Sequence, residues 1–282
     1  MDVIKLPADV QACIRQQRQA GRTVGVVPTM GALHDGHLSL VEAARTECDF
    51  VVTTIFVNPT QFGPGEDFDK YPRTMDTDLE LCASAGTDLV FTPSVDDMYP
   101  PNSCSTVVVS DITRVLEGQS RPTHFDGVTT IVAKLFNITL PDRAYFGQKD
   151  YQQQLVIQRM VQDLNWPLKV VTCPIVREYD GLAMSSRNRY LSAQERNRAL
   201  VLSGTLKWAQ KAASSGRNAV EVQKEMAKRL QSVDGLELDY AVVADPKTLR
   251  PAESHAATAV ALLAVRVGAT RLIDNDMLTF AE

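Results

Sequence analysis

The first half of the chain alternates short apolar runs with segments of helical periodicity. An apolar, β-branched run at 23–27 is followed by a helical pattern that begins near His37. The next apolar run, at 50–57, is uninterrupted, which is typical of a parallel strand buried on both faces. These segments predict a strand, a helix and a second strand that lie side by side.

The same alternation continues to about residue 173. We expect helices at 75–85, 127–137 and 151–164, and strands at 88–91, 106–109, 143–146 and 168–173. Repeated alternation of strands and helices is typical of a parallel sheet covered by helices. The pattern therefore predicts an α/β fold with a Rossmann-like, doubly wound parallel sheet.

The pattern changes after Pro174. We place a domain boundary near Ile175, with a first domain at 1–175 and a second domain at 176–282. In the second domain, Ser192 and Glu195 form a capping box that begins a long helix. That helix is expected to end near 213, and the remaining expectations are a helix at 219–230 and strands at 236–243, 257–265 and 271–277. Because no helical pattern separates the last two strands, a smaller α+β domain with antiparallel strands is predicted.

Composition and charge exclude several classes of protein. With 44% hydrophobic and 22% charged residues, the composition is that of an ordinary globular protein. The formal net charge of −5 provides no general basic field for nucleic acid, so an anionic ligand needs a local cluster of Lys and Arg. No run approaches ~18 apolar residues, and no signal sequence is recognised. We expect neither a membrane nor a nucleic-acid partner.

The cysteines indicate a reducing compartment. They number five and include no C-x-x-C pair, which argues against a disulfide framework and a structural zinc site. We expect a cytoplasmic protein with buried thiols at Cys13, Cys48, Cys82, Cys104 and Cys173.

The loop at 28–37 joins the first predicted strand to the first predicted helix. Its His34 and His37 are three residues apart and can project from one side of the first helical turn. Ligands of open α/β sheets bind beyond the carboxyl ends of strands, and free N–H groups at a helix N-terminus favour phosphate. Gly31 and Gly36 allow the backbone to approach such a ligand closely. Two imidazoles here can donate hydrogen bonds to phosphoryl oxygens, whereas a capping or surface role is the alternative for each histidine.

Uncharged amides follow the second predicted strand. Asn58 and Gln61 offer donors and acceptors that suit a hydroxylated organic substrate, while a turn built around Pro59 is the alternative explanation. Acidic residues come next in the chain, of which one could hold a hydrated Mg²⁺ on nucleotide phosphates and most would form a solvated helix face. These acidic residues are Asp67, Asp69, Asp76 and Asp78.

Two further loops carry positive charge. Lys149 is a point charge for phosphate, and Asp150 at the start of a helix either accepts bonds from ribose hydroxyls or caps the helix. Beyond the predicted boundary, Ser185 and Ser186 precede Arg187, whose guanidinium can bind phosphate oxygens in a bidentate way. A serine-rich loop at this place is suited to a lid that closes on a triphosphate.

Together these segments resemble a known family. His34-Asp-Gly-His37 is similar to the H-x-G-H signature of the nucleotidyltransferase superfamily, and the segment 184–187 is similar to its K-M-S-K-S loop without the lysines. Six motifs between residues 28 and 188 resemble the pantothenate synthetase family: P-T-M-G-A-L-H-x-G-H, F-V-N-P-x-Q-F, Y-P-R-T, H-F-x-G-V, F-G-x-K-D and M-S-S-R-N.

The resemblance implies a reaction and its participants. Enzymes of this family use ATP and Mg²⁺ to join pantoate to β-alanine through a pantoyl adenylate, with release of AMP and pyrophosphate. The implied fold is a Rossmann-like N-terminal domain with a smaller C-terminal lid, and the implied assembly is a homodimer.

The resemblance also implies roles for individual residues. The implied catalytic residues are His34, His37, Lys149 and Arg187, with His37 favoured over His34 as the proton donor. The residues implied to bind ATP are Met30, Gly31, Ala32, Leu33, His34, Asp35, Gly36, His37, Gly147, Gln148, Lys149, Asp150, Val176, Met184, Ser185, Ser186 and Arg187. Those implied to bind pantoate or β-alanine are Gln61, Gln153, Asn58 and Arg121. Asp78 is the implied Mg²⁺ position, through water, and Thr77 beside it is not acidic.

Two other functions fit part of the pattern. A nucleotidyltransferase that makes a dinucleotide or a nucleotidylated carrier would share the phosphate loop. It would not need the amides of Asn58, Gln61 and Gln153 for a small hydroxy acid. A non-catalytic regulator would bind ATP without turnover.

Overall fold

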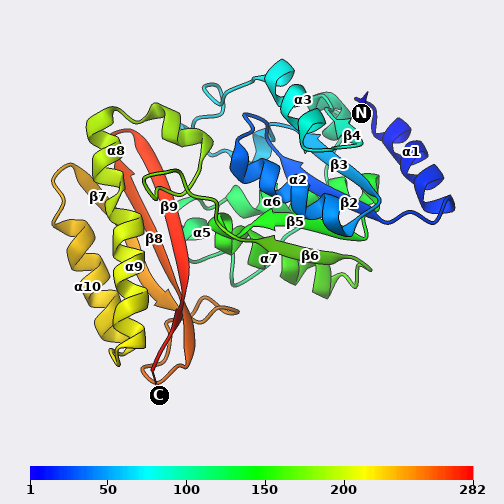
Figure 1. Cartoon of the computed structure of the whole chain (residues 1–282). Coiled ribbons are helices and arrows are strands. Elements are labelled where there is room, and N and C mark those ends of the chain that lie inside the picture. Colours follow the sequence, from blue (N-terminus) through cyan, green and yellow to red (C-terminus); the bar gives the residue numbers. More distant parts are fainter. Residues whose placement is uncertain (282) are drawn as a thin grey trace. The chain divides into compact units, whose positions relative to one another are not determined.

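The computed structural model describes residues 1–281, and the chain divides into two compact units (Figure 1). The first unit comprises Met1–Gln148 and Gln152–Pro174. The second comprises Ile175–Glu282 together with the short segment Lys149–Tyr151. A short segment from within the sequence range of the first unit is therefore grouped with the second.

A six-stranded parallel sheet forms the centre of the first unit. The order of its strands is β1-β4-β3-β2-β5-β6. These strands are β1 Asp2–Ile4, β2 Val24–Thr29, β3 Phe50–Ile55, β4 Leu89–Phe91, β5 Arg143–Gly147 and β6 Lys169–Cys173. The doubly wound α/β class predicted from the alternating pattern is confirmed.

Helices cover both faces of this sheet (Figure 1). Successive residues of a strand point to opposite faces, and in β2 the side chains of Val26 and Val27 are both fully buried, in different cores. The core around Val26 includes residues of α1 Pro7–Gln19, α6 His124–Thr139 and α7 Tyr151–Asp163. The opposite face is covered by α2 Asp35–Glu47 and α3 Met75–Ser84. Two short helices, α4 Val95–Met98 and α5 Glu117–Ser120, lie in the connections.

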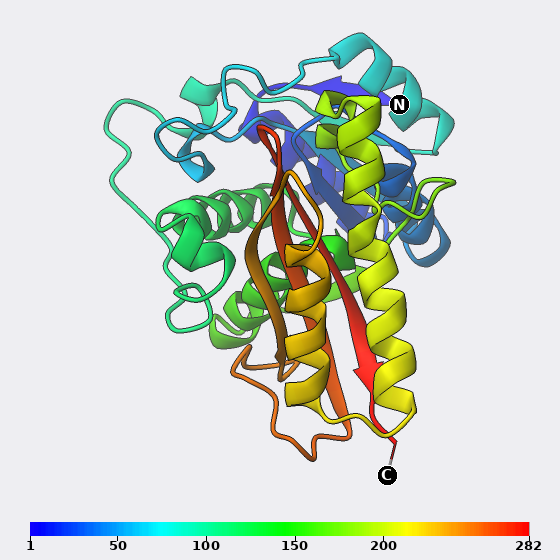
Figure 2. The same ribbon diagram turned by 90° about the vertical axis from the view of Figure 1, so that its left-hand side faces the viewer.

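The second unit is a small α+β structure with its own core. Its antiparallel sheet has the order β7-β8-β9, formed by β7 Leu236–Ala244, β8 Thr258–Val267 and β9 Thr270–Thr279. Its helices are α8 Ala193–Ala199, α9 Val201–Ser214 and α10 Ala219–Gln231. Figure 2 shows α9 and α10 lying along the three strands. Their apolar faces bury Leu202, Leu206 and Met226 in the core shared with the sheet, as the predicted antiparallel domain requires.

Three local expectations were wrong. Within the described residues, 106–109 form no strand; instead the N–H of Val107 donates to the Thr130 hydroxyl of α6, 3.0 Å away. The sheet position next to β4 is taken by β1, a strand of three residues whose exposed side chains show no alternation. The single helix expected after Ser192 is two, because the chain turns at Leu200 between α8 and α9.

The expectation of five buried thiols was also only partly right. Cys48, Cys82 and Cys173 are buried, Cys13 is half-buried and Cys104 is exposed. Cys104 follows Pro100 and Pro101 in an irregular connection, where no hydrophobic periodicity was present to guide its placement.

Helix α10 allows the packing of the second unit to be tested. Met226 is completely buried, whereas Val220 on the same helix is 63% exposed. Met226→Ala should lower the free energy of unfolding by about 2–5 kcal/mol, because it removes buried methylene groups and leaves a cavity. Val220→Ala should change it by less than ~0.5 kcal/mol. Denaturant unfolding followed by far-UV circular dichroism measures both, and equal losses would contradict this arrangement of α10.

Candidate active site

The loops that follow β2 and β5 begin at the switch point of the sheet. After β2 the chain forms β3 on one side, and it later returns to form β5 on the other side of β2. At such a point two neighbouring loops leave in opposite directions, and the crevice beyond the strand ends receives ligands in open α/β sheets. The loop at 30–34 and the segment that starts at Gly147 therefore occupy the expected place.

The loop after β2 is held by a buried carboxylate from α3. Asp78 is 2% exposed; its Oδ2 accepts a hydrogen bond from the Ala32 N–H at 2.9 Å, and its Oδ1 accepts one from the Leu33 N–H at 2.8 Å. The hydroxyl of Thr74, which precedes α3, donates to the same carboxylate at 3.2 Å. Asp78 thus supports the loop at 30–34, which the sequence predicts to bind phosphate.

Two residues of this loop have left-handed backbone conformations. Gly31 has a φ of 81° and Ala32 has a φ of 50°. A Cβ atom at Gly31 would lie 3.0 Å from Asp78 Oδ2 and 3.1 Å from Ile55 Cγ2. Glycine is favoured at this position because the φ value is strained for a larger residue and a Cβ atom would press on Asp78 and Ile55.

The paired histidines meet at the N-terminus of α2. His34 is the residue that precedes the helix, in an extended conformation, and its carbonyl accepts the His37 N–H at 2.7 Å. The two imidazole rings have centroids 4.1 Å apart and an interplanar angle of 35°. Both side chains are partly exposed. Two ring donors beside the positive end of a helix dipole form a site suited to phosphate.

The amide pair lies in the turn that follows β3: Asn58 precedes the one-turn helix η1 Pro59–Gln61, and Gln61 is its last residue. Asn58 is completely buried, and its Oδ1 accepts the Tyr99 hydroxyl at 2.9 Å and the Thr60 hydroxyl at 3.0 Å. Its Nδ2 donates to Gln61 Oε1 and to the Gly127 carbonyl, at 3.1 Å in each case. Asn58 is therefore bonded within the protein, and its direct contact with substrate stays a prediction.

The bond from Asn58 fixes the orientation of the Gln61 amide. Because Gln61 Oε1 accepts from Asn58, its Nε2 is the donor end that faces the loop after β2, where it donates to Met30 Sδ at 3.0 Å. A thioether is a weak acceptor, so a carboxylate or hydroxyl oxygen can displace it. The first unit thus brings the amide donor of Gln61 next to the loop that is predicted to bind phosphate.

Arg121 is paired with an acidic residue that was not among the predicted site residues. Its guanidinium forms a bidentate pair with Glu66, with both N–O distances at 2.6 Å. Partial burial acts to raise the pKa of Glu66, but the hydrogen bond and positive charge of Arg121 outweigh it and the pKa is lowered. Arg121 also donates to the Gln61 carbonyl at 3.2 Å. The binding of substrate by Arg121 stays a prediction.

His124, the first residue of α6, contacts the same carbonyl. Its Nδ1 lies 2.9 Å from the Gln61 carbonyl oxygen, and the residue is 8% exposed. Burial, followed by the positive charge of Arg121, lowers the pKa of His124 to about 4, against the smaller opposing effects of its hydrogen bond to the Gln61 backbone, of Glu117 and of Glu66. His124 is therefore neutral at pH 7. In the sequence, His124 belongs to the H-F-x-G-V motif, for which no role was predicted.

In the second unit, the backbone of Lys149 is hydrogen-bonded to a residue of β9, a contact that was not predicted from the sequence. The side-chain Nδ2 of Asn275, in β9, donates to the Lys149 carbonyl at 2.8 Å, and Asn275 is 1% exposed. Lys149 Nζ lies 3.7 Å from Asp150 Oδ1. Asn275 could not be found from the sequence, because only the fold brings it to Lys149.

The serine-rich loop is fastened at both ends. The Met184 N–H donates to the Val176 carbonyl at 3.0 Å, and the Ser185 hydroxyl accepts the Arg187 N–H at 3.3 Å, at the start of the short helix η3 Ser186–Tyr190. Asn188 Nδ2 then donates to Glu178 at 2.6 Å and to the Ala183 carbonyl at 3.0 Å. The predicted residues Val176 and 184–187 are thus neighbours within the second unit.

The remaining predicted residues lie at element ends of the first unit. Gly147 is the last residue of β5, Gln148 follows it, and Gln153 is partly exposed on the first turn of α7. The neighbouring Gln152, which was not predicted, anchors the connection before α6 through its bonds to the Ile112 carbonyl and the Glu117 N–H. The substrate-binding role of Gln153 stays a prediction.

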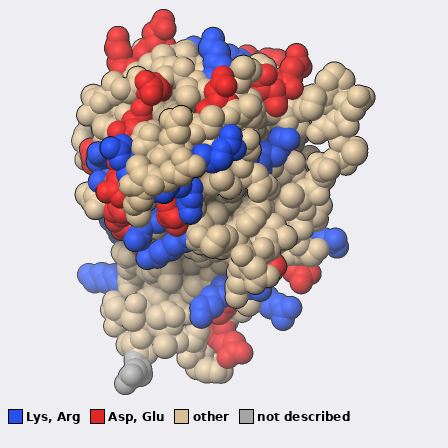
Figure 3. All heavy atoms as spheres, turned by 90° about the vertical axis from the view of Figure 1, so that its right-hand side faces the viewer, with Lys and Arg blue, Asp and Glu red and all other residues tan. Residues whose placement is uncertain are grey.

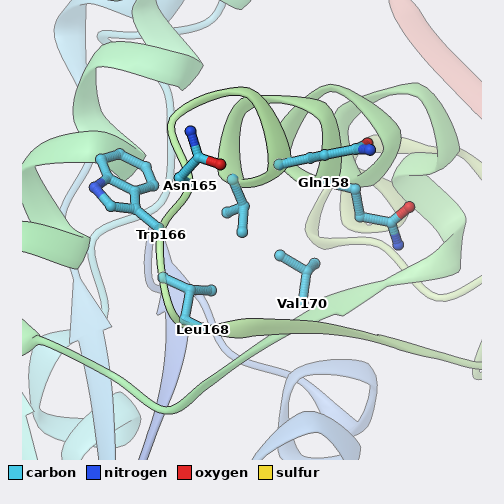
Figure 4. A pocket seen from close by; sticks show the side chains of 7 residues that line it. Gln158, Asn165, Trp166, Leu168 and Val170 are labelled. Atoms are coloured by element: carbon cyan, nitrogen blue, oxygen red, sulfur yellow. The ribbon is translucent and has the colours of Figure 1, made fainter.

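A pocket of about 360 Å³ lies elsewhere on the first unit, between the C-terminal half of α7 and β6 (Figure 4). It is lined by Gln158, Asn165, Trp166, Leu168 and Val170, among others, and by none of the predicted site residues.

On the face of the molecule in Figure 3, basic and acidic side chains are interspersed. No helix of the described residues has the length and apolar character needed to cross a membrane.

The described residues do not form a metal centre of their own. No group of three or more His, Cys, Asp or Glu among residues 1–281 could hold an ion. Both oxygens of Asp78 accept bonds from the loop backbone. The role of Asp78 toward Mg²⁺, through water, stays a prediction.

Comparison with known proteins agrees with these features. A sequence model described as pantoate-beta-alanine ligase matches residues 2–277. The chain belongs to the pantoate-beta-alanine ligase family. It is 52% identical to a pantothenate synthetase of Moorella thermoacetica over 99% of both chains. A crystal structure of pantothenate synthetase from Thermus thermophilus matches with a TM-score of 0.93 and 46% identity, and covers 98% of this chain and 99% of its own.

A third relative in this family was solved with ligands. It is a pantoate-beta-alanine ligase from Francisella tularensis, described as complexed with beta-gamma ATP and beta-alanine. It matches with a TM-score of 0.81 and 34% identity, and covers 98% of this chain and 97% of its own. The chain is thus an enzyme of a ligase family.

The role of Asp78 can be tested by Asp78→Asn. The amide keeps the size of the carboxylate but turns an N–H group toward the N–H donors of Ala32 or Leu33. We expect the free energy of unfolding to fall by about 1–3 kcal/mol, the usual cost of an unsatisfied buried group. Displacement of the loop should also lower kcat/KM for ATP by about 10²-fold.

Asp76→Asn is the matched control, because Asp76 is exposed on the first turn of the same helix. Thermal unfolding and steady-state kinetics with varied ATP measure both effects. If Asp78→Asn and Asp76→Asn gave the same stability and the same kcat/KM, Asp78 would not hold the loop.

The lowered pKa of His124 predicts a pH-dependent stability. In the unfolded chain the His124 imidazole has an ordinary pKa near 6.5, whereas in the folded protein it is protonated only near pH 4. Stability from this group is therefore fully present above pH 6.5 and is lost as the pH falls toward 4. Between pH 7.5 and 4.5 the loss is about 2–3 kcal/mol by linkage. Urea unfolding at pH 7.5 and pH 4.5 measures this loss for wild type and for His124→Asn. The wild type should lose about 2–3 kcal/mol more than the variant between the two pH values. Equal losses for the two proteins would contradict the lowered pKa of His124.

Proposed function

We propose that the chain catalyses the ATP-dependent condensation of pantoate with β-alanine, through a pantoyl adenylate, with release of AMP and pyrophosphate. The observation that carries this proposal is the position of Gln61 Nε2, 3.0 Å from Met30 Sδ of the phosphate loop. Adenylation requires a carboxylate and the α-phosphate side by side, and this geometry offers an amide donor beside a phosphate-binding turn. The ATP and β-alanine named for the Francisella tularensis relative support the same substrates.

In the first half-reaction, a pantoate carboxylate oxygen attacks the α-phosphorus, and the bond to the β-phosphate oxygen breaks. Gln61 and Gln153 orient the hydroxy acid, and His34 and His37 donate to phosphate oxygens at the N-terminus of α2. His37 is the favoured proton donor. Lys149, with Ser185, Ser186 and Arg187, offsets the charge of the departing pyrophosphate. The protein supplies position and charge, and no protein nucleophile is required.

In the second half-reaction, the amine of β-alanine attacks the acyl carbon of the adenylate, and AMP leaves. The mixed anhydride is open to hydrolysis, so water must be kept away from it. We propose that residues 176–282 serve as a lid for this purpose. The loop at 184–187 is part of this proposed lid, and the hydrogen bond from the Met184 N–H to the Val176 carbonyl holds it within its own unit.

We place Mg²⁺ with the nucleotide. Mg²⁺ in nucleotide sites keeps several waters and is bound mainly by substrate phosphates. Since the carboxylate of Asp78 is bonded to the loop backbone, the ion enters as part of the substrate, and no step above uses a metal held by the protein. We also propose a cytoplasmic location and a homodimeric assembly. Light scattering coupled to gel filtration tests the assembly directly.

The reaction is tested by the acids on which AMP formation depends. Pyrophosphate release should require pantoate, and AMP release should require pantoate and β-alanine together. AMP formation that is independent of both acids would overturn the ligase proposal. It would instead favour a nucleotidyltransferase with another acceptor.

Lys149→Ala tests the charge assigned to the lysine. We expect adenylation to fall by about 10²-fold or more, because removal of a preorganised charge from the transition state is costly. His34→Ala and His37→Ala should lower it to a similar extent. Lys224→Ala is the control, since Lys224 is exposed on α10. Quenched-flow measurement of pyrophosphate release compares the four variants, and an unchanged rate for Lys149→Ala would remove the lysine from the mechanism.

A further inference from the structure

His124 is buried against the turn that carries Gln61. Its Nδ1 lies 2.9 Å from the Gln61 carbonyl oxygen, and the residue is 8% exposed. A carbonyl oxygen can only accept a hydrogen bond, so Nδ1 must carry the proton. The neutral ring is then the tautomer with a bare Nε2. Burial beside Arg121 keeps the ring neutral at pH 7, which makes this donor constant over the physiological range.

The backbone around Gln61 is held from several directions. Arg121 donates to the same carbonyl at 3.2 Å and is itself fixed by its bidentate pair with Glu66. One turn further along α6, a Cβ atom at Gly127 would lie 2.4 Å from the Thr60 carbonyl oxygen. The first turn of α6 therefore packs directly against the backbone of η1, and only glycine allows that approach.

The side chain of Gln61 is fixed at its other end. Asn58 donates to Oε1 at 3.1 Å, which leaves Nε2 as the end that faces Met30. With the backbone carbonyl and Oε1 both bonded, the remaining freedom of the side chain is small. If the Gln61 backbone carbonyl moved, the direction in which Nε2 donates would therefore change as well.

We propose that His124 is a positioning residue, whose Nδ1–H holds the Gln61 carbonyl and thereby aims the Gln61 amide at the hydroxy-acid substrate. This inference rests on the proposed function, because it assigns the target of the amide. His124 does not touch the substrate in this role. Its removal should weaken binding of pantoate and leave binding of ATP unchanged.

Two variants separate the donor from the ring. Asn places its Nδ2 close to the position of the histidine Nδ1, so His124→Asn keeps the hydrogen bond, whereas His124→Leu fills the space without a donor. A hydrogen bond of ordinary net strength corresponds to a change of roughly 3–10-fold. His124→Leu should therefore raise KM for pantoate by roughly 3–10-fold in pyrophosphate release, with KM for ATP within about 2-fold of wild type. His124→Asn should restore KM for pantoate to within about 2-fold of wild type.

His255→Leu serves as the control, because the His255 side chain is 81% exposed. Equal changes in KM for both substrates, or no rescue by His124→Asn, would overturn the positioning role. Nitrogen-15 NMR of the histidine rings in the wild-type protein gives a measurement that needs no variant to fold. A protonated Nδ1 and bare Nε2 for His124 at pH 7 are expected, and a protonated Nε2 would overturn the proposal. Absence of pantoate-dependent pyrophosphate release in the wild type would instead refute the proposed function and leave the tautomer result standing.

Discussion

The hydrogen bonds from the Ala32 and Leu33 N–H groups to the Asp78 carboxylate are the constraint on which the rest of the site depends. Left-handed conformations such as that of Ala32 cost about 1–3 kcal/mol. Two hydrogen bonds to a charged group contribute about 1.5–3 kcal/mol each, enough to offset that strain. Because the turn leads directly into α2, the same bonds decide where the helix begins and where His34 and His37 meet.

The substrate side of the site is built by the same kind of indirect support. A chain of bonds runs from the Tyr99 hydroxyl to Asn58 and from Asn58 to Gln61, so a residue next to α4 determines which end of the Gln61 amide faces the phosphate loop. The oxygen and nitrogen ends of a buried side-chain amide can exchange places, and the hydrogen bonds of the neighbouring residues determine which end faces which way. The direction in which the Gln61 amide donates is therefore set by residues that no ligand needs to touch.

The sequence predicted the fold well wherever hydrophobic periodicity was strong. Buried parallel strands such as β3 appear as continuous apolar runs, and capped helices such as α10 show a clear periodicity. It failed where tertiary contacts decide the structure. The three residues of β1 become a strand only because β4 offers them a partner. The β-branched run at 106–109 is hydrogen-bonded to hydroxyl groups of α6 and forms no strand.

Prediction of the site had the same limit. The spacing of His34 and His37 is a local property, so their meeting at a helix N-terminus could be expected before the fold was known. Burial is not local: the acidic residues Asp76 and Asp78 lie on one turn, and only the packing of α3 makes Asp78 the inaccessible one, with both oxygens turned to the loop. A sequence motif thus identifies the groups that face a ligand, while the residues that aim them follow from the fold.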